Sequence, residues 1–554
     1  MRGHLSHRLP QAISGSLLFL AVLCAAGCQS RSEYFGKVDP PAGNVLRFNN
    51  GVEPEYIDPN LLAGVQDARI AGMIFEGLTV YDERDLHPAP GAAERWEVSS
   101  DLTLYTFHLR KGAVWSDGHP LTAHDFVYSW RRILDPKTAS RYASMLYYIE
   151  NGEAFNVGKV KDASKLGVRA LDDYTLEVKL RQPVSYFLSL TAHETYMPVP
   201  AHVVERYGDR WTDPSHIVGN GPFQLVEHRT NDKFEFIRNP RYWNSAGVKL
   251  DRVTAYSVDD NHTAANLYEA GVVDWVPDYI PSDYMGYMRG RFKDLYTPPY
   301  LGIYYYAVNI TRPPLNNPLV RRALAMGFDR RAITGDLLRA GQIPASHFVP
   351  VGFPNYHSPP GPDYNPPEAA RLLAEAGYPN GAGFPSVTIL INTLSEHRKI
   401  AEAVQEMWAK NLNIQVSIRN EEWASYLKDR RSMNYDLARA AWIADYPDPS
   451  TFTDLMEGNN GNNDGGWKNP GYDRMIALAR QQPEESRRME ILEKAEALLL
   501  HDLPVIPVYT YSADGLIKPY VRGVYGNALD RHALNRVWID RQWKTGRPKS
   551  GDEL

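Results

Sequence analysis

Hydrophobic residues recur along the chain with two different periods, and the two alternate from residue 45 onward. The run Val45–Phe48 is typical of a strand, and Tyr105–Leu109 alternates like a second one. Thr122, with Asp125 three positions later, predicts a capping box at the start of a helix. The apolar residues that share one face of this helix are Phe126, Trp130 and Ile133. Helices and strands are therefore mixed from the beginning.

The middle of the chain continues this mixture. Phe223–Glu227 and Lys233–Arg238 flank a polar turn and predict a hairpin. Asn317 followed by Pro318 supplies an N-cap and a first-turn proline for a helix. The residues at helical spacing in it are Val320, Ala323, Leu324 and Phe328. A second helix is predicted to begin at the next proline pair and to end before a glycine: Pro366, Pro367, Gly377 and Pro379 mark its limits.

A strand, a helix and a strand are then predicted in succession. Val387–Ile391 has the composition of a buried strand. The following helix carries one apolar stripe, formed by Ile400, Val404, Met407 and Trp408. Ile414, Val416 and Ile418 then alternate. This order is typical of βαβ units, so the predicted fold class is α/β.

The first residues have the pattern of a targeting segment. Arg2 and Arg8 form a positive region, and the apolar stretch Ala12–Ala26 is too short to span a bilayer. Cys28 follows small residues directly, as in lipoproteins whose new N-terminal cysteine is acylated. Leu23 lies further upstream of Cys28 than the leucine usual in such signals, and a plain cleaved secretory signal is the alternative. The polar residues 29–44 lack periodicity and predict a tether.

Composition narrows the function classes. The formal net charge of −6 gives no support to nucleic-acid binding. With 43% hydrophobic and 23% charged residues, the chain has the composition of a globular protein, and its length predicts about three domains. One of the two cysteines lies inside the targeting segment and the other is Cys28, so no disulfide is expected in the mature protein. Tyrosine is twice as frequent as phenylalanine, 34 against 17, and suits surfaces that bind while staying wet.

Motifs for catalysis or cofactor binding are lacking in the sequence. It has no Gly-x-Ser-x-Gly elbow, no His-Glu-x-x-His, no Walker loop and no dinucleotide fingerprint. The 16 histidines are scattered, and the neighbours His119 and His124 do not share a helical face. We therefore expect no enzyme, no cofactor and no metal site. A secreted peptidase remains the competing class.

The segment between Tyr435 and Pro449 combines an apolar middle with two opposite charges, Arg439 and Asp445. If the chain is extended, both side chains point the same way and lie roughly 20 Å apart, too far to pair. Two interpretations remain open. Each charge has its own protein partner, as half-buried charges usually do, or both face a cleft where a zwitterionic ligand brings the counter-charges.

Several separated blocks resemble the oligopeptide-binding proteins of bacterial ABC importers, the extracytoplasmic solute-binding protein family 5. The blocks are Trp115–Trp130 (WSDGHPLTAHDFVYSW), Asn239–Trp243 (NPRYW), Tyr304–Tyr306 with Asn316 and the Arg321–Leu324 helix, Trp442–Tyr446 (WIADY) and Val505–Tyr509 (VIPVY). The resemblance runs from about Val45 to beyond Tyr509. It implies a two-lobed, periplasmic-binding-protein-like (type II) fold with an additional domain, in which the lobes close over a ligand by hinge motion.

The resemblance also implies a division of the chain. The parts are a signal peptide (1–27), a tether (28–44), lobe I (45–75, 201–301 and 513–554), an extra α/β domain (76–200) and lobe II (302–512).

Site residues follow from the resemblance one by one. Asp445 matches an aspartate that pairs with the peptide α-ammonium, and Tyr142 matches a tyrosine of the same pocket. The basic residues matched to the ligand carboxylate, according to peptide length, are Arg439, Arg430 and His397. The other peptide-binding residues are Trp423, Trp442, Tyr300 and Tyr305, which match pocket aromatics, together with Ile443 and with Val65 on a segment that hydrogen-bonds the peptide backbone. Binding through main-chain bonds and wet pockets implies broad specificity.

The implied partners are short peptides, the permease subunits of an ABC importer, and the membrane through a lipid on Cys28. A monomer in the periplasm or at the cell surface is expected. Two departures leave the preferred peptide open: Ala63 replaces a glutamate near Val65, and a lysine of the carboxylate end is replaced near Leu338, beside Arg339. A peptide-sensing receptor, or a binder of dipeptides, murein tripeptide or a signalling peptide, is the alternative.

Overall fold

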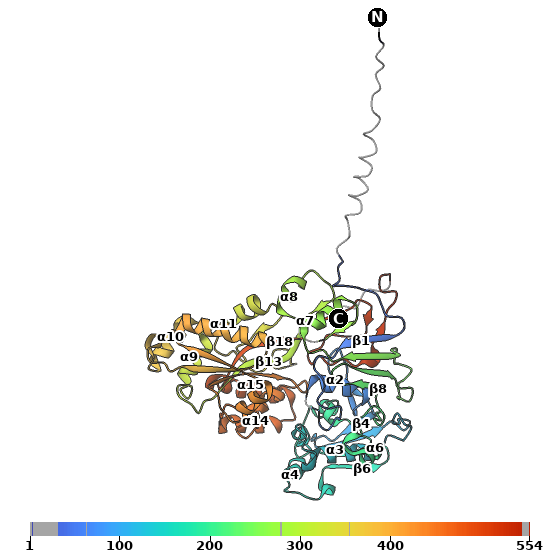
Figure 1. Cartoon of the computed structure of the whole chain (residues 1–554). Helices are drawn as coiled ribbons and strands as arrows, with labels where there is room; N and C mark the ends of the chain where they lie inside the picture. Colours follow the sequence, from blue (N-terminus) through green and yellow to red (C-terminus); the bar gives the residue numbers. More distant parts are fainter. Residues whose placement is uncertain (1–2, 4–31, 63, 278–279, 354, 546–552) are drawn as a thin grey trace.

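The computed structural model describes residues 3, 32–62, 64–277, 280–353, 355–545 and 553–554. Two bodies lie side by side in Figure 1. One is built on a six-stranded sheet, and the other on a seven-stranded and a four-stranded sheet. The predicted α/β class is confirmed.

The seven-stranded sheet belongs to lobe I and gathers three distant parts of the chain. Its order is β12-β19-β11-β1-β10-β9-β8. The strands are β1 (Val45–Asn49), β8 (Phe223–Arg229), β9 (Lys233–Arg238), β10 (Arg252–Tyr256), β11 (Trp275–Val276), β12 (Leu295–Tyr296) and β19 (Gly515–Ile517). The helices are α2 (Val65–Ile74), α7 (Asn261–Glu269) and α8 (Ser282–Met288), and the short strands β20 (Val521–Arg522) and β21 (Trp538–Ile539) pair with each other. The predicted hairpin is β8 and β9.

The extra domain has a four-stranded antiparallel sheet in the order β4-β5-β7-β6. Its strands are β4 (Ala93–Val98), β5 (Leu104–Leu109), β6 (Val168–Asp172) and β7 (Thr175–Lys179), beside the pair β2 (Thr79–Tyr81) and β3 (Pro88–Pro90). Its helices are α3 (Ala123–Leu134), α4 (Gly152–Asn156) and α5 (Phe187–Leu190), and α6 (Ala201–Tyr207) packs against α3. The predicted capping box opens α3, where the Thr122 N–H donates to Asp125 Oδ2 at 2.8 Å.

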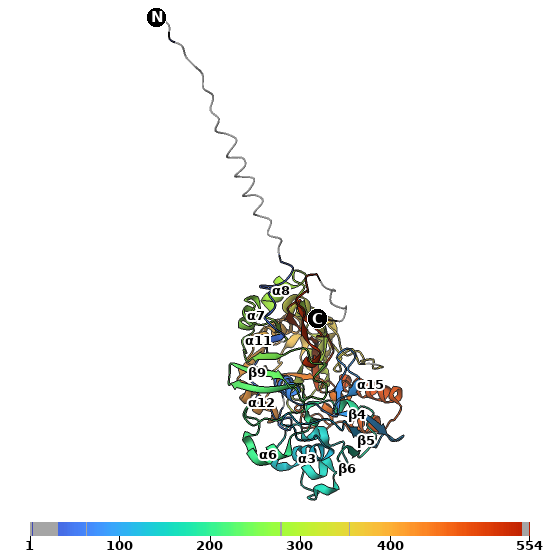
Figure 2. The ribbon, with the colours of Figure 1, turned by 90° about the vertical axis from the view of Figure 1, so that its right-hand side faces the viewer.

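One hydrophobic core joins lobe I to the extra domain. Phe48 of lobe I and Phe107 and Trp130 of the extra domain belong to the same cluster of buried side chains. The side view in Figure 2 shows the extra domain at the end of the molecule opposite α7 and α8. Continuous packing of this kind resists sliding, so the two units form one body against lobe II.

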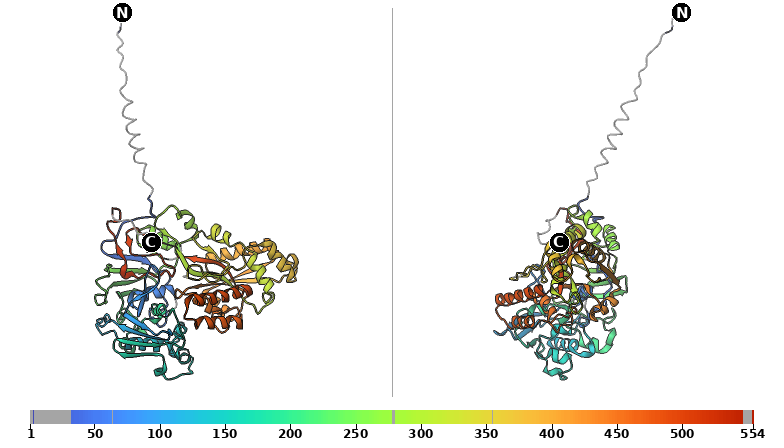
Figure 3. Two further views of the ribbon diagram at one scale, coloured as in Figure 1. Left: turned by 180° about the vertical axis from the view of Figure 1, so that it is seen from behind. Right: turned by 90° about the vertical axis from the view of Figure 1, so that its left-hand side faces the viewer.

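Lobe II has the sheet order β14-β18-β13-β17-β15-β16. The strands are β13 (Pro299–Val308), β14 (Ile343–Pro344), β15 (Val387–Asn392), β16 (Val416–Glu421), β17 (Leu437–Ile443) and β18 (Val505–Ser512). The helices are α9 (Pro318–Met326), α10 (Pro366–Glu375), α11 (Ser395–Leu412), α12 (Trp423–Arg431), α13 (Ser450–Thr453), α14 (Pro470–Arg480) and α15 (Glu485–Asp502), with a π-helix at Ala332–Leu338. Figures 1 and 3 show α9, α10 and α11 on one side of this sheet and α14 and α15 on the other.

The predicted βαβ unit is β15, α11 and β16, with its two strands parallel. Two residues expected inside regular elements lie just outside them. Helix α9 ends at Met326, so Phe328 is buried beyond the helix, and Ile414 is buried in the loop before β16. Asn413 at the end of α11 has φ 54°, a left-handed conformation that ends a helix.

The segment expected to be a tether is partly attached to lobe I. Phe35 is buried against Tyr268 and Phe292, and its N–H lies 3.0 Å from both carboxylate oxygens of Asp294. The Lys518 ammonium donates to the Phe35 carbonyl at 2.9 Å. Any free tether therefore ends before Phe35.

The two bodies touch across the cleft between them. The Tyr446 ring of lobe II stacks on Tyr186 of the extra domain, with centroids 5.1 Å apart and planes within 7°. Arg488 of lobe II lies over the same Tyr186 ring, 5.3 Å from its centroid. The chain crosses between the bodies at residues 297–298 and 513–514. Two crossings and a closed contact fit a hinge-bending molecule in its closed arrangement. Among the described helices, none combines the length and apolar character that a membrane span requires.

Candidate functional site

Strand β17 carries the charged segment into the cleft and stops before Asp445. It pairs with β13 and β15 in the middle of the lobe II sheet and ends at Ile443. The Asp445 N–H then donates to Thr451 Oγ1 at 3.2 Å, outside the sheet. Pro447 and Pro449 follow, and proline has no N–H to continue a ladder. The extended geometry considered for Arg439 and Asp445 therefore does not apply to the end of this segment.

Asp445 faces the extra domain. Its Oδ1 accepts a hydrogen bond from the Tyr142 hydroxyl at 3.4 Å, which brings together the two residues predicted for the amine pocket. Burial raises the pKa of Asp445 to about 7, although the Arg531 charge and the Tyr142 hydrogen bond oppose the rise. The nearby Glu194 adds to it. A carboxyl group with this pKa gains strongly from an incoming cation.

Sequence reasoning missed two charged residues of this pocket. Arg531 forms an ion pair with Glu194, and both act electrostatically on Asp445. Arg531 lies in the loop between β20 and β21, and no periodicity or motif marks it. Glu194 lies in a run of buried residues, Leu190 to Pro200, where a carboxylate is unusual. This burial is visible only in the structure, so the sequence offered no signal for Glu194. The interpretation in which a half-buried charge has protein neighbours therefore holds in part for Asp445.

A small cavity of about 50 Å³ brings further predicted residues together from both bodies. Val65 of lobe I lines it together with Tyr300 and Ile443 of lobe II. Val65 is the first residue of α2, so its N–H has no acceptor within the helix. A backbone donor thus stands at the wall of the cleft, on a helix start rather than on an extended segment.

Arg439 is held by neutral groups. Its guanidinium donates to the Tyr511 hydroxyl at 2.9 Å and to Asn392 Oδ1 at 3.4 Å, and lies 5.0 Å from the Tyr304 ring centroid. Within the described residues no carboxylate forms an ion pair with it, and its buried Nε has no hydrogen-bond partner. A partly buried cation without a counter-charge is costly, and a ligand carboxylate would relieve that cost.

His397 shares this environment. It is 6% exposed, and its ring lies 5.6 Å from that of Tyr304. Burial, together with the Arg439 charge, lowers the pKa of His397 to about 2, so the imidazole is neutral. It can donate a hydrogen bond to a ligand but brings no positive charge of its own.

Arg430 and Tyr305 lie in a different environment from Arg439. Arg430 forms an ion pair with Asp464, and its Nη1 donates to the Tyr426 hydroxyl at 3.3 Å. Tyr305 packs in the cluster on the α14 and α15 side, whereas Tyr304 packs on the α9 and α11 side. The structure thus separates the two arginines, and only the charge of Arg430 is already neutralised.

Of the remaining predicted residues, Trp442 has a described side chain. Trp442 is partly buried, and its indole N–H lies 3.4 Å from Thr451 Oγ1, beside the Asp445 turn. The Trp423 side chain, Ala63 and Cys28 lie outside the described residues.

Two lobes joined at a hinge enclose a cleft, and groups of opposite charge lie at separate places in this cleft. This arrangement defines a binding protein that captures its ligand between the lobes. Residues 87–464 match the model of the bacterial extracellular solute-binding proteins, family 5 Middle. The chain belongs to this family of solute-binding proteins.

Named relatives extend the match to nearly the whole chain. The periplasmic oligopeptide-binding protein OppA of Salmonella typhimurium is 37% identical over 531 residues, covering 94% of this chain and 97% of OppA. The crystal structure of Haemophilus influenzae OppA in complex with RPPGFSPFR superimposes with a TM-score of 0.81 at 36% identity, covering 91% of this chain and 100% of that one.

The murein tripeptide binding protein MppA of Escherichia coli superimposes with a TM-score of 0.82 at 36% identity, covering 90% of this chain and 99% of that one. The unliganded open form of MppA, at the same identity, superimposes with a TM-score of only 0.73, covering 91% and 98%. The better match to the Haemophilus influenzae OppA complex than to this open form agrees with the closed contact between Tyr446 and Tyr186.

Proposed function

We propose that this protein captures short peptides in the cleft between its two bodies and delivers them to an ABC importer. Asp445, with Tyr142, receives the peptide α-ammonium, and Arg439, with His397, receives the carboxylate. The observation that carries the proposal is that Arg439, which has no counter-charge among the described residues, lies in the same lobe as Asp445, whose pKa is raised. A zwitterionic ligand would supply both missing counter-charges.

The peptide class is supported by the relatives, which are named for oligopeptides, murein tripeptide and, in one complex, a nine-residue peptide. Main-chain donors such as the Val65 N–H suit recognition that does not depend on the peptide's sequence. The remaining peptide-binding residues of the proposal are Arg430, Trp423, Trp442, Ile443, Tyr300 and Tyr305. Arg430 would act on a ligand only in competition with Asp464.

Native mass spectrometry of the purified protein tests capture. The expected spectrum shows the protein carrying a short peptide, and the released peptide keeps its mass after prolonged incubation, because the proposed role includes no catalysis. A protein that binds no peptide from a mixed tryptic digest, or that returns cleavage products, would contradict the proposal.

Delivery and anchoring are separate parts of the proposal. Acylation of Cys28 would hold the monomeric protein on the outer side of a membrane, near the permease. Metabolic labelling with a palmitate analogue tests this, and Cys28→Ala should abolish the label while leaving peptide binding unchanged. Uptake of a radiolabelled peptide by cells lacking the protein distinguishes import from sensing. If the protein serves import, peptide uptake by these cells should fall.

A further inference from the structure

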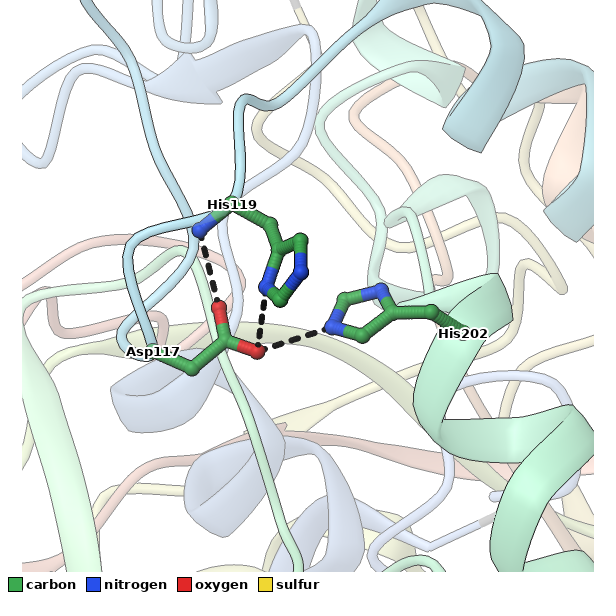
Figure 4. Close-up of side chains that lie close together, drawn as sticks. All are labelled: Asp117, His119 and His202. Carbon is green, nitrogen blue, oxygen red and sulfur yellow. Dashed lines mark hydrogen bonds and ion pairs between the residues drawn. The ribbon is translucent and has the colours of Figure 1, made fainter.

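Three side chains converge on the surface outside the cleft: Asp117, His119 and His202 (Figure 4). Asp117 and His119 lie on the turn before α3, and His202 lies on α6. All three are exposed, and none of them lines the cleft cavities that hold Val65, Tyr300 or Arg531. They are therefore available to a ligand that has no part in peptide capture.

The donor atoms of these side chains point at one spot. Asp117 Oδ2 lies 2.9 Å from Nδ1 of His119 and 2.8 Å from Nε2 of His202. The three donor atoms all lie within 4.8 Å of one another, and the two ring centroids are 4.3 Å apart. Two imidazole nitrogens and one carboxylate oxygen are thus already assembled around a common point.

The backbone holds this arrangement in place. Asp117 Oδ1 accepts the His119 N–H at 3.1 Å, and the Gly118 N–H donates to the Trp115 carbonyl at 2.8 Å, which closes the turn. Gly118 has φ +100°, a conformation that favours glycine. Trp115 is fully buried, and the Ser116 N–H donates to Gly219 O at 2.9 Å, so the turn, which belongs to the extra domain, is tied to lobe I. Little reorganisation is needed to keep the donors together.

We propose that Asp117, His119 and His202 form a binding site for a divalent transition-metal ion, with Zn²⁺ as its best-matched occupant. Zn²⁺ is bound in proteins by imidazole nitrogen and carboxylate oxygen at about 2.0–2.2 Å, commonly with three protein ligands and one water. The imidazole pair disfavours Ca²⁺ and Mg²⁺, which prefer oxygen ligands. Because the side chains are exposed, water completes the coordination. The cation replaces the hydrogen bonds that now hold the two rings to Asp117.

Charges around the cluster do not prevent binding. The Arg241 guanidinium donates to the Ser116 carbonyl at 3.0 Å and is the cation beside this turn. The Asp125 carboxyl group, at the start of α3, interacts electrostatically with His202 and so lies near the cluster. His124 lies on α3 at 3.6 Å from Asp173 and outside the cluster, which makes it a matched control.

Calorimetric titration of ZnCl₂ into the full mature protein, prepared without a polyhistidine tag, tests the proposal. The wild type is expected to show a single saturable event. His119→Ala and His202→Ala should each weaken it roughly tenfold or more, whereas His124→Ala should leave it unchanged. Near-wild-type melting temperatures confirm that the variants fold. Absence of saturable Zn²⁺ uptake by the wild type, or unchanged binding by His202→Ala, would overturn the site.

X-ray absorption at the zinc edge provides a second readout. Two nitrogen ligands with the multiple-scattering pattern of imidazole are expected at about 2.0–2.1 Å. A spectrum with oxygen ligands alone would contradict the assignment. Peptide affinity measured on the same samples should not change with Zn²⁺, because the cluster lies outside the cleft.

Discussion

The Tyr142 hydroxyl lies 3.4 Å from Oδ1 of Asp445 and thereby joins the extra domain to lobe II at the proposed amine pocket. The two residues are far apart in sequence and belong to the two bodies that close over the cleft. A ligand ammonium at Asp445 would thus be recognised by groups from both sides. Under the proposed function, this contact would couple capture to closure.

Asp445→Ala is expected to weaken binding of free-amine peptides by roughly 3 kcal/mol or more, because it strands the ammonium in a partly buried pocket. Asp445→Asn, which keeps the shape and a hydrogen bond to Tyr142, should also lose most of this energy. Calorimetry with matched free and N-acetylated peptides checks it. Equal losses for both peptides would exclude the role of Asp445 as amine partner.

Peptide affinity should fall on acidification from pH 8 to pH 6. Burial raises the pKa of Asp445 to about 7 in the free protein, and pairing with an ammonium would lower it. Below pH 7 the carboxyl group is mostly protonated and must release a proton to bind the amine. The dissociation constant should therefore rise by up to about tenfold per pH unit below 7.

Titrations in two buffers with different ionisation enthalpies would measure the released proton directly. N-acetylated peptides and the Asp445→Asn variant serve as controls, since neither should show the same slope. His397 does not titrate in this range in the free protein, because its pKa is lowered to about 2. An affinity that increases on acidification would contradict the prediction.

Arg439 and Arg430 should behave differently on substitution. Arg439→Gln should weaken binding of peptides with a free carboxylate more than binding of their amides, because Arg439 has only neutral partners among the described residues. Arg430→Gln should instead lower the free energy of unfolding by about 3 kcal/mol, since it leaves Asp464, 9% exposed, without its counter-charge.

Calorimetry with acid and amide forms of one peptide, together with urea unfolding of both variants, separates the two effects. A large loss of carboxylate preference in Arg430→Gln with unchanged stability would reverse the assignment.

Removal of the Tyr446 ring should open the molecule. Tyr446 is 3% exposed, stacks on Tyr186, and is part of the core cluster of the opposite body. Tyr446→Ala should increase the radius of gyration of the peptide-free protein in small-angle scattering and weaken peptide binding. The aromatic contact contributes about 0.5–1.5 kcal/mol beyond its buried area.

Tyr446→Phe keeps the stacking and should remain closed. Tyr287→Ala, which removes a tyrosine that is 49% exposed on α8, should have no effect on the scattering curve. A Tyr446→Ala protein as compact as the wild type would show that other contacts hold the bodies together.

Stability should decrease as the pH rises from 5 to 7.5. Burial raises the pKa of Glu496 from 4.5 to about 7, against hydrogen bonds from Tyr356 and from the backbone of Phe348 and Val349. Between these two values the folded protein binds a proton that the unfolded chain has lost. The resulting stabilisation is complete below pH 4.5 and is lost as the pH passes through 7.

This contribution amounts to about 3 kcal/mol for Glu496 alone. Urea unfolding at several pH values would measure it. Glu496→Gln, which is neutral at all these values, should flatten the dependence by that amount. The same slope in the variant as in the wild type would show that other groups cause it.

Much of the fold could be predicted from the sequence, because its elements depend on neighbouring residues. The Thr122 and Asp125 cap, the Asn317 cap and the β15–α11–β16 unit follow from local hydrogen bonding and from periods of 3.6 and 2. Asp445 was predicted from a block of sequence that resembles a known family, and Tyr142 and Arg439 were predicted because the same resemblance matches them to pocket residues. Local interactions and family patterns are both written along the chain.

Only the tertiary structure decided which charges meet. Arg531 pairs with Glu194 and acts electrostatically on Asp445, and Asp464 neutralises Arg430 but not Arg439. His119 lies beside His202 and not beside His124, which is nearer in sequence. Each of these partners comes from a distant segment, and which one a side chain reaches depends on how the sheets and the two bodies pack. The sequence by itself thus determined the elements and the class of protein, whereas long-range packing determined the electrostatics of the cleft and of the surface cluster.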